Sequence, residues 1–263
     1  MAIERITPSD HEEWRRVGLH HLQRYEFAGR FTKDAKVLDL ACGNGYGSFA
    51  LMNFGAKTVR GVDIDPGAIE YASSHYRRPG LTYACGDAFA EVSVEGGYGV
   101  VVSFETIEHL AEPKLFISKL RDLVSPDGLL VISAPNALQC SRAATPVLNP
   151  FHVSEPTYDE FCDWLSDDFV VEQEWEQSPA VMNFNAQGEL LQYSSFARVI
   201  LAFEQKLKSL IRHRSVDAVR KIVRRRSSYC EITTTMQPLM PERKNDADVF
   251  VFVCRPKTSQ PGK

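Results

Sequence analysis

Short apolar runs alternate with stretches of helical spacing through the first half of the chain. A run of apolar residues bounded by glycine or polar residues predicts a buried strand, and apolar residues three or four apart predict a helix. We expect strands over 36–40, 58–63, 81–84, 99–104 and 128–133, and helices over 46–54, 66–75 and 113–123. This alternation predicts an α/β fold with a parallel, doubly wound sheet.

The flanking regions follow other patterns. Apolar residues on one helical face predict a helix over 9–27, although Gly18 lies on that face and weakens the prediction. Thr157 and Glu160 have the spacing of a capping box, which marks the start of a helix. After residue 135 the expected elements are a loop over 136–156, a helix over 157–165, a strand over 169–175, an amphipathic helix over 196–212 and a last strand over 249–254.

Composition places the protein in a broad class. Its 263 residues are 44% hydrophobic and 24% charged, values typical of a soluble globular protein and not of a disordered or fibrous one. No apolar run reaches the roughly 18 residues of a membrane-spanning helix, and the first residues lack the pattern of a signal peptide. The six cysteines form no CxxC pair, which indicates reduced thiols. We therefore expect a cytoplasmic protein.

A glycine turn after the first strand is the strongest candidate for a ligand site. The sequence GNG at 43–45 lets the backbone turn sharply and approach a ligand closely. Asp63, at the end of the second strand, can accept both hydroxyls of a ribose, and Asp87 after the third strand could bind an adenine amine. A dinucleotide site is the alternative, but Ser48 replaces its third glycine, and Asp39 suits an ammonium group better than a pyrophosphate.

At about residues 20–135 the chain resembles the class I S-adenosylmethionine-dependent methyltransferases. The segments VLDLACGNGYG, GVDIDPGAIEYA, CGDA and GVVVSFETIEHL resemble four motifs of that superfamily, and HLQRYEFA resembles the helix that precedes the core in glycan-modifying members. The resemblance implies a Rossmann-like sheet of seven strands with helices on both faces. Its last strand would be antiparallel, and a helical insert would precede that strand.

The same resemblance implies how S-adenosylmethionine would be held. Its methionine moiety would lie against Asp39 and the glycine turn, its ribose on Asp63, and its adenine between Ile64 and Ala88. The full set implied to bind the cofactor is Arg24, Tyr25, Asp39, Gly43, Gly45, Asp63, Ile64, Asp87, Ala88 and Phe104.

Acidic and imidazole side chains follow the fourth strand, where the methyl group would point. Glu105, Glu108 and His109 have i, i+3, i+4 spacing and would share one face if the turn is helical. His152 lies beyond the last parallel strand and could be a fourth ligand. Such a set can hold Mg²⁺ or Mn²⁺, which would lower the pKa of a hydroxyl and hold it in line. Metal-free catalysis with His109 or His152 as general base, or a structural role, stays open.

Further resemblances suggest the acceptor. ExxEH with a distal histidine resembles small-RNA 2′-O-methyltransferases and ubiquinone-pathway O-methyltransferases, and NPFHVSEPTYDEF resembles bacterial methyltransferases of sugars and polysaccharides. We expect a metal-assisted O-methyltransferase that acts on a vicinal diol of a sugar or glycan, in polysaccharide biosynthesis. The alternatives are an RNA 2′-hydroxyl, a catechol- or quinone-type small molecule, and a protein that binds the cofactor without turnover.

Charge adds a candidate partner. The net charge is −4, but residues 206–226 carry nine Lys or Arg and one acid, so this segment is +8 and the remainder −12. A solvated charged face is the simplest interpretation. Contact with an anionic lipid surface, or with a lipid-linked or phosphorylated glycan, is the alternative. RNA is less favoured, because the chain shows no RNA-binding module.

These features divide the chain into four expected sections. They are a helical lid over 1–34, a cofactor-binding core over 35–135, substrate-side loops with the helical insert over 136–245, and a final strand and tail over 246–263.

Overall fold

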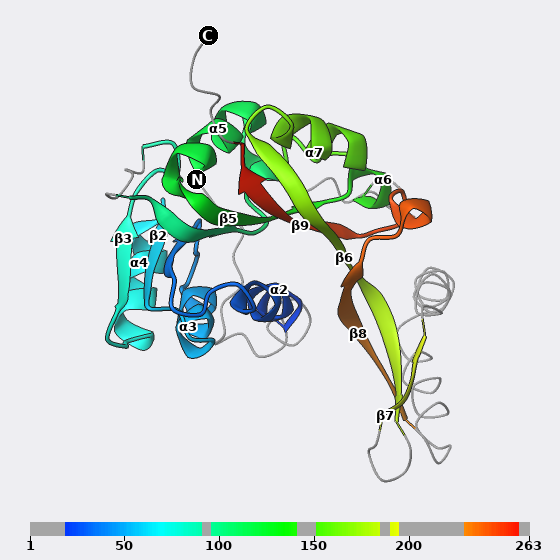
Figure 1. Ribbon diagram of the computed structural model, residues 1–263. Coiled ribbons are helices and arrows are strands. Elements are labelled where there is room, and N and C mark those ends of the chain that lie inside the picture. The colour runs from blue at the N-terminus through cyan, green and yellow to red at the C-terminus, as the bar shows by residue number, and fades with distance from the viewer. Residues whose placement is uncertain (1–18, 91–95, 141–150, 185–189, 195–228, 258–263) are drawn as a thin grey trace. The chain divides into compact units, whose positions relative to one another are not determined.

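The computed structural model describes residues 19–90, 96–140, 151–184, 190–194 and 229–257 (Figure 1). The chain forms two compact units. The larger unit, the core, contains residues 1–176 and 236–263, and the smaller contains residues 177–235. In the sequence, residues 177–235 were expected to belong to one section with the rest of 136–245.

A mixed sheet organises the core, in the strand order β3-β2-β1-β4-β5-β9-β6. Neighbours from β3 to β5 are parallel, whereas β9 runs antiparallel to β5, from Leu130 opposite Cys254 to Pro135 opposite Val249. Both the parallel α/β sheet and the antiparallel last strand are therefore confirmed. The bounds are β1 Lys36–Leu40, β2 Thr58–Asp63, β3 Leu81–Cys85, β4 Tyr98–Ser103, β5 Val124–Pro135, β6 Phe169–Phe184 and β9 Val249–Pro256.

Helices cover both faces of this sheet. α2 and α3 lie on one face, and α5 and α7 on the other (Figure 1). Alternate residues of β9 show why its apolar run is continuous: Phe250 and Phe252 pack with α5 and α7, while Val251 and Val253 pack with α2 and α3. The helices are α2 Leu19–Gly29, α3 Tyr46–Asn53, α4 Pro66–His75, α5 Pro113–Leu123, α6 Ala137–Cys140 and α7 Tyr158–Leu165, with 3₁₀ turns η2 Ile107–His109 and η3 Pro241–Arg243.

Local signals explain where two of these helices start. The Asp65 side chain accepts a hydrogen bond from the Gly67 amide, and Pro66 occupies the first position of α4. The predicted capping box at the start of α7 is confirmed, because the Thr157 and Glu160 side chains each accept from the other residue's backbone amide.

The structure differs from the sequence analysis after residue 135. α6 falls in the expected loop over 136–156, and β6 continues to Phe184 instead of ending at residue 175. In the smaller unit the outer half of β6 pairs antiparallel with β7 (Leu190–Ser194), and β6 also pairs with β8 (Tyr229–Pro238). The sheet thus has nine described strands instead of seven.

The amphipathic helix predicted over 196–212 and the basic segment 206–226 lie outside the described residues. The first part of the helix predicted over 9–27 also lies outside them, and its remainder belongs to α2. None of the helices in the described ranges combines the length and hydropathy that a membrane span needs. The cysteines described are free thiols, namely Cys42, Cys85, Cys162 and Cys254.

Candidate active site

The loops after the parallel strands meet at the carboxyl edge of the sheet, where open α/β sheets bind their ligands. The glycine turn follows β1 there, in a left-handed backbone at Gly43 (φ 53°) and Gly45 (φ 81°). The Gly43 amide donates to Asp63 Oδ2 at 2.8 Å, and the Asp65 amide donates to Asp63 Oδ1 at 3.0 Å. A Cβ atom at Gly43 would meet no atom within 4 Å, so this turn borders open space. Asp63 therefore lies in a fixed position at the edge of a space that a ligand can enter.

Asp39 lies deeper than an exposed ligand-binding acid. Its carboxyl is fully buried and accepts hydrogen bonds from Ser48 Oγ at 2.6 Å and from Tyr25 Oη at 3.2 Å. Burial raises the pKa of Asp39 to about 7, and the two hydrogen bonds oppose that rise. Ser48, which the sequence analysis noted only as a missing glycine, anchors this acid to α3.

Helix α2 brings Arg24 and Tyr25 against the glycine turn. The Tyr25 ring packs on Gly47 and makes edge contacts with Tyr46 and Phe104, at centroid separations of 5.9 and 5.1 Å. The Arg24 side chain is also buried. Both predicted residues are thus buried, with Tyr25 beside the turn and Arg24 near Glu105, and their contact with a cofactor stays a prediction.

The residues expected at the adenine are arranged around the ends of β2 and β3. Ile64 directly follows Asp63, and 60% of its surface is exposed although it is a large apolar residue. Asp87 accepts a hydrogen bond from the Phe89 amide at 2.9 Å, which fixes its loop, and Ala88 is partly buried against the core. Ile64 therefore offers an open apolar surface beside a fixed carboxylate.

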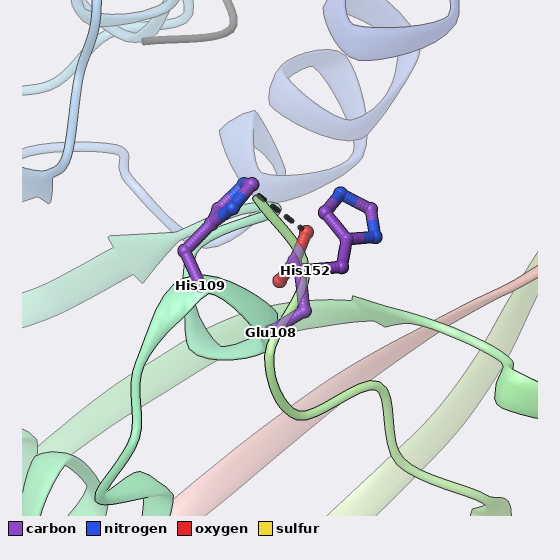
Figure 2. A group of neighbouring side chains, drawn as sticks. All are labelled: Glu108, His109 and His152. Atoms are coloured by element: carbon purple, nitrogen blue, oxygen red, sulfur yellow. Dashed lines mark ion pairs between the residues drawn. The ribbon is translucent and has the colours of Figure 1, made fainter. Parts of the chain in front are cut away.

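Glu108, His109 and His152 form one cluster, with one potential ligand atom from each within 4.8 Å of the others (Figure 2). The Glu108 side chain is 1% exposed, and neither of its oxygens accepts a hydrogen bond from the described residues. Its Oε1 lies 3.9 Å from His109 Nε2. Burial, followed by the charge of Glu105, raises the pKa of the Glu108 carboxyl well above its ordinary value. A bound cation would satisfy this carboxylate.

The second ring nitrogen of each histidine contacts an oxygen outside the cluster. His109 Nδ1 lies 3.0 Å from the Phe151 carbonyl oxygen, which can only accept, so Nδ1 carries a proton and Nε2 is the ring nitrogen that could bind a cation. His152 Nδ1 contacts the Glu155 carboxylate. The two rings stand edge to face, with centroids 4.8 Å apart at 79°.

Backbone contacts hold the two halves of the cluster together. The amides of Val153 and Ser154 both donate to the Glu108 carbonyl, at 2.8 and 3.0 Å. The Ser154 hydroxyl lies 3.1 and 2.8 Å from the carbonyl oxygens of Ile107 and Leu110. The loop that carries His152 is therefore fixed to η2. No spacing rule in the sequence indicates Ser154, because its partners are far away in the chain.

Glu105 is not one of the three cluster residues, and the helical turn that would place it on one face with Glu108 and His109 does not include it. Its backbone is left-handed (φ 48°), and η2 begins only at Ile107. The Glu105 carboxylate instead accepts from Ser133 Oγ at 2.8 Å and lies 3.9 Å from Arg24 Nη2. The cluster therefore offers two imidazoles and one carboxylate, a set that suits a first-row transition ion better than Mg²⁺.

Comparison with known proteins relates this fold to methyltransferases. Residues 38–132 match the methyltransferase domain family. A probable S-adenosylmethionine-dependent methyltransferase of Mycobacterium tuberculosis H37Rv is 34% identical over 132 residues, covering 50% of this chain and 47% of the relative. A similar protein of Mycolicibacterium smegmatis is 30% identical over 62% of each chain. A ubiquinone biosynthesis O-methyltransferase of Azorhizobium caulinodans is 35% identical, over 41% of this chain and 43% of its own.

The matched region thus spans between 43% and 62% of the length of these relatives. Among solved structures, an S-adenosylmethionine-dependent methyltransferase of Mesorhizobium loti aligns with a TM-score of 0.56 at 12% identity, over 88% of this chain and 97% of that one. The N-methyltransferase NodS of Bradyrhizobium japonicum, in complex with S-adenosylhomocysteine, aligns at 0.50 with 18% identity, over 62% and 82%. At these identities the likeness establishes the fold.

The glycine turn, the strand order and the sequence matches agree with one another: residues 38–132 match a methyltransferase domain, and the chain shares its fold with a solved S-adenosylmethionine-dependent methyltransferase.

Proposed function

We propose that the protein is an S-adenosylmethionine-dependent O-methyltransferase in which Glu108, His109 and His152 hold a divalent cation beside the acceptor hydroxyl. The observation that carries this proposal is the Glu108 carboxylate, which is buried next to two imidazoles. A buried carboxylate without hydrogen-bond donors costs folding free energy, and a cation would offset that cost. The cluster also lies at the sheet edge that carries the cofactor motif.

The cofactor would lie along the ends of β1 to β3. Asp63, held by two backbone amides, would accept the ribose hydroxyls, and the exposed Ile64 and Ala88 would contact the adenine. Asp39 would act mainly as an anchor for Tyr25 and α3, since its carboxyl is buried and doubly hydrogen-bonded.

In methyl transfer, the acceptor oxygen attacks the methyl carbon, the carbon–sulfur bond breaks, and the hydroxyl loses its proton. When bound, the cation would lower the pKa of that hydroxyl. The chain itself supplies orientation, because the hydrogen bonds of Val153 and Ser154 keep His152 at a fixed place relative to η2. This orientation would align the acceptor with the methyl group.

Three protein ligands leave room for two neighbouring oxygens of an acceptor. The first candidate is a vicinal diol of a sugar or glycan, based on the resemblance of the segment around His152 to sugar methyltransferases. The basic segment 206–226 would then contact an anionic or lipid-linked carrier of that glycan. A catechol- or quinone-type small molecule is the second candidate, favoured by the 35% identity to a ubiquinone biosynthesis O-methyltransferase.

Calorimetric titration of Mn²⁺ into the protein saturated with S-adenosylhomocysteine tests the cation site. We expect one bound ion in the wild type and none in Glu108→Gln or His152→Ala. Glu105→Gln is the matched control, because Glu105 is a neighbouring carboxylate outside the cluster and its loss should still leave one bound Mn²⁺ ion. If the wild type binds no ion, the cation proposal fails and a histidine general base takes its place.

The ribose assignment has a separate test. Asp63→Ala should weaken S-adenosylhomocysteine binding by about 1.5–3 kcal/mol, because hydrogen bonds to a charged acceptor are lost. The control is Asp65→Ala, two residues away, which removes the cap of α4 and should leave the affinity unchanged. Equal affinities of Asp63→Ala and the wild type would show that the ribose does not bind there.

A panel of acceptors distinguishes the two substrate classes. Transfer of labelled methyl groups to vicinal-diol sugars and to catechols is compared with transfer to analogues that lack one of the two oxygens. If the acceptor must offer two neighbouring oxygens, deoxy sugars and simple phenols should not be methylated. Equal rates with the one-oxygen analogues would contradict it.

A further inference from the structure

A fourth side chain, that of Glu155, contacts the cluster through His152. The Glu155 carboxylate is within hydrogen-bond distance of His152 Nδ1, and the two side chains are 21% and 18% exposed. Glu155 was not among the residues that the sequence analysis selected. Its carboxylate contacts Nδ1, so Nε2 is the His152 ring nitrogen that would serve the cluster.

The two histidines differ in the oxygen behind them. His109 Nδ1 faces a neutral backbone carbonyl, that of Phe151, whereas His152 Nδ1 faces a carboxylate. A hydrogen bond to a charged acceptor is roughly twice as strong as one between neutral groups. His109 lies in η2, but His152 lies in a segment with no helix or strand, so it depends more on side-chain contacts for its orientation.

We infer that Glu155 is a positioning residue that keeps the proton of His152 on Nδ1 and so presents the Nε2 lone pair to Glu108 and His109. This inference rests on the proposed function, because it gives Nε2 a cation to bind. An outer carboxylate on a metal-binding histidine fixes its tautomer and raises its basicity, and removing such a partner commonly reduces metal affinity about 10- to 100-fold.

A purely structural ion pair is the alternative interpretation. In that case His152 would be an imidazolium, and Glu155 would only stabilise the loop. Glu160 provides the comparison within the same segment, because its carboxylate accepts hydrogen bonds from the Thr157 amide and hydroxyl and caps α7. Removing Glu160 should therefore affect stability and not the His152 ring.

The tautomer can be measured directly in the metal-free protein. Histidine ¹⁵N shifts at neutral pH distinguish the imidazolium and both neutral tautomers, and His152→Asn identifies the His152 signals. We expect neutral His152 with the proton on Nδ1 in the wild type. Glu155→Gln, which keeps an oxygen acceptor, should retain this state, whereas Glu155→Ala should move the proton to Nε2 in a substantial fraction. Glu160→Gln should have no effect.

Calorimetric Mn²⁺ titration is the second readout, with a loss of about 10- to 100-fold in Glu155→Ala, a smaller loss in Glu155→Gln, and none in Glu160→Gln. If Glu155→Ala does not fold, Glu155→Asp, which withdraws the carboxylate by one methylene, replaces it. An imidazolium in the wild type, or an unchanged tautomer in Glu155→Ala, overturns the inference. If wild-type protein binds no Mn²⁺, the cation proposal fails, and the tautomer readout alone decides the role of Glu155.

Discussion

The Asp39 carboxyl illustrates how one buried residue links stability to pH. Its pKa rises to about 7 from an ordinary value of 3.8, chiefly because it is removed from water. Between these two values the native protein holds a proton that the unfolded chain has lost. Stability from this group is therefore complete below about pH 4, falls as the pH rises to 7, and is constant above 7.

Asp39→Asn should remove this pH dependence, because an amide does not titrate. Between pH 5 and pH 8 the unfolding free energy of the wild type should fall by about 2–3 kcal/mol more than that of the variant. Urea denaturation of both proteins at the two pH values measures the difference. Parallel pH profiles would show that Asp39 is ionised in the folded protein at pH 5.

At the residue scale, the sequence shows which side chains suit a cation better than it shows which residues contact each other in the fold. Glu108, His109 and His152 could be selected because their residue types suit a cation and they follow strand ends, and the structure brings these three together. The left-handed backbone of Glu105 could not be predicted, because a non-glycine residue gives no sign of it. Ser154 could not be predicted either, since its function depends on distance in space.

At the scale of elements, α2 and α3 fit together at one residue. A Cβ atom at Gly47 would lie 2.0 Å from the Tyr25 ring, so only glycine allows the ring to pack there and reach Asp39. The position of α2 against the glycine turn therefore depends on the absence of a side chain at Gly47.

Gly47→Ala should destabilise the protein by about 1–3 kcal/mol through overpacking, and should weaken S-adenosylhomocysteine binding. The cost should be smaller in a Tyr25→Ala background, since the clash is then removed. Chemical denaturation of the four proteins of this cycle gives the coupling energy. Gly67→Ala in α4 is the control and should be close to neutral, because its nearest contact is a movable carboxylate at 3.2 Å. Additive effects at positions 25 and 47 would disprove the packing argument.

Elements long enough to show the apolar spacing of a helix or strand were predicted well. The helix bounds Pro66–His75 and Pro113–Leu123 agree with the prediction, because an N-terminal proline and an apolar face define each helix. α6 has four residues, too few to show helical spacing. β8 did carry a signal, the β-branched run Ile232-Thr233-Thr234-Thr235, which the expectation of a helical insert obscured.

At the scale of the whole molecule, hydrogen bonds connect the two points at which the chain leaves the core and returns to it. The Leu239 amide donates to the Glu174 carbonyl at 2.9 Å. The buried carboxylate of Glu176 accepts hydrogen bonds from Gln237 and Arg243. The segment before residue 177 and the segment after residue 235 are thus joined by hydrogen bonds within the core. The number of strands could not be predicted, because β7 and β8 extend the sheet within the region that was expected to be a helical insert.

Replacing residues 177–236, which are the smaller unit and the first residue of the core after it, Met236, by Asn-Gly should give a folded core. This two-residue turn would connect Glu176 to Gln237, which already contact each other. We expect S-adenosylhomocysteine affinity within about threefold of the wild type, well below the tenfold change that 1.4 kcal/mol would cause. Calorimetry and thermal unfolding measure both properties. A core that does not fold would show that the smaller unit is required for its stability.

The position of β9 affects how the protein is made. β9 pairs with β5 and lies between it and β6 in the sheet, yet it follows both in the chain, after a stretch of about 64 residues beyond β6. At roughly 5–20 residues per second, a ribosome needs several seconds to produce this stretch. During that time β5 keeps an apolar edge, which includes Val131 and Ile132, without its partner strand. This interval is when the nascent chain is most liable to aggregate, and when chaperones that bind exposed strands would protect it.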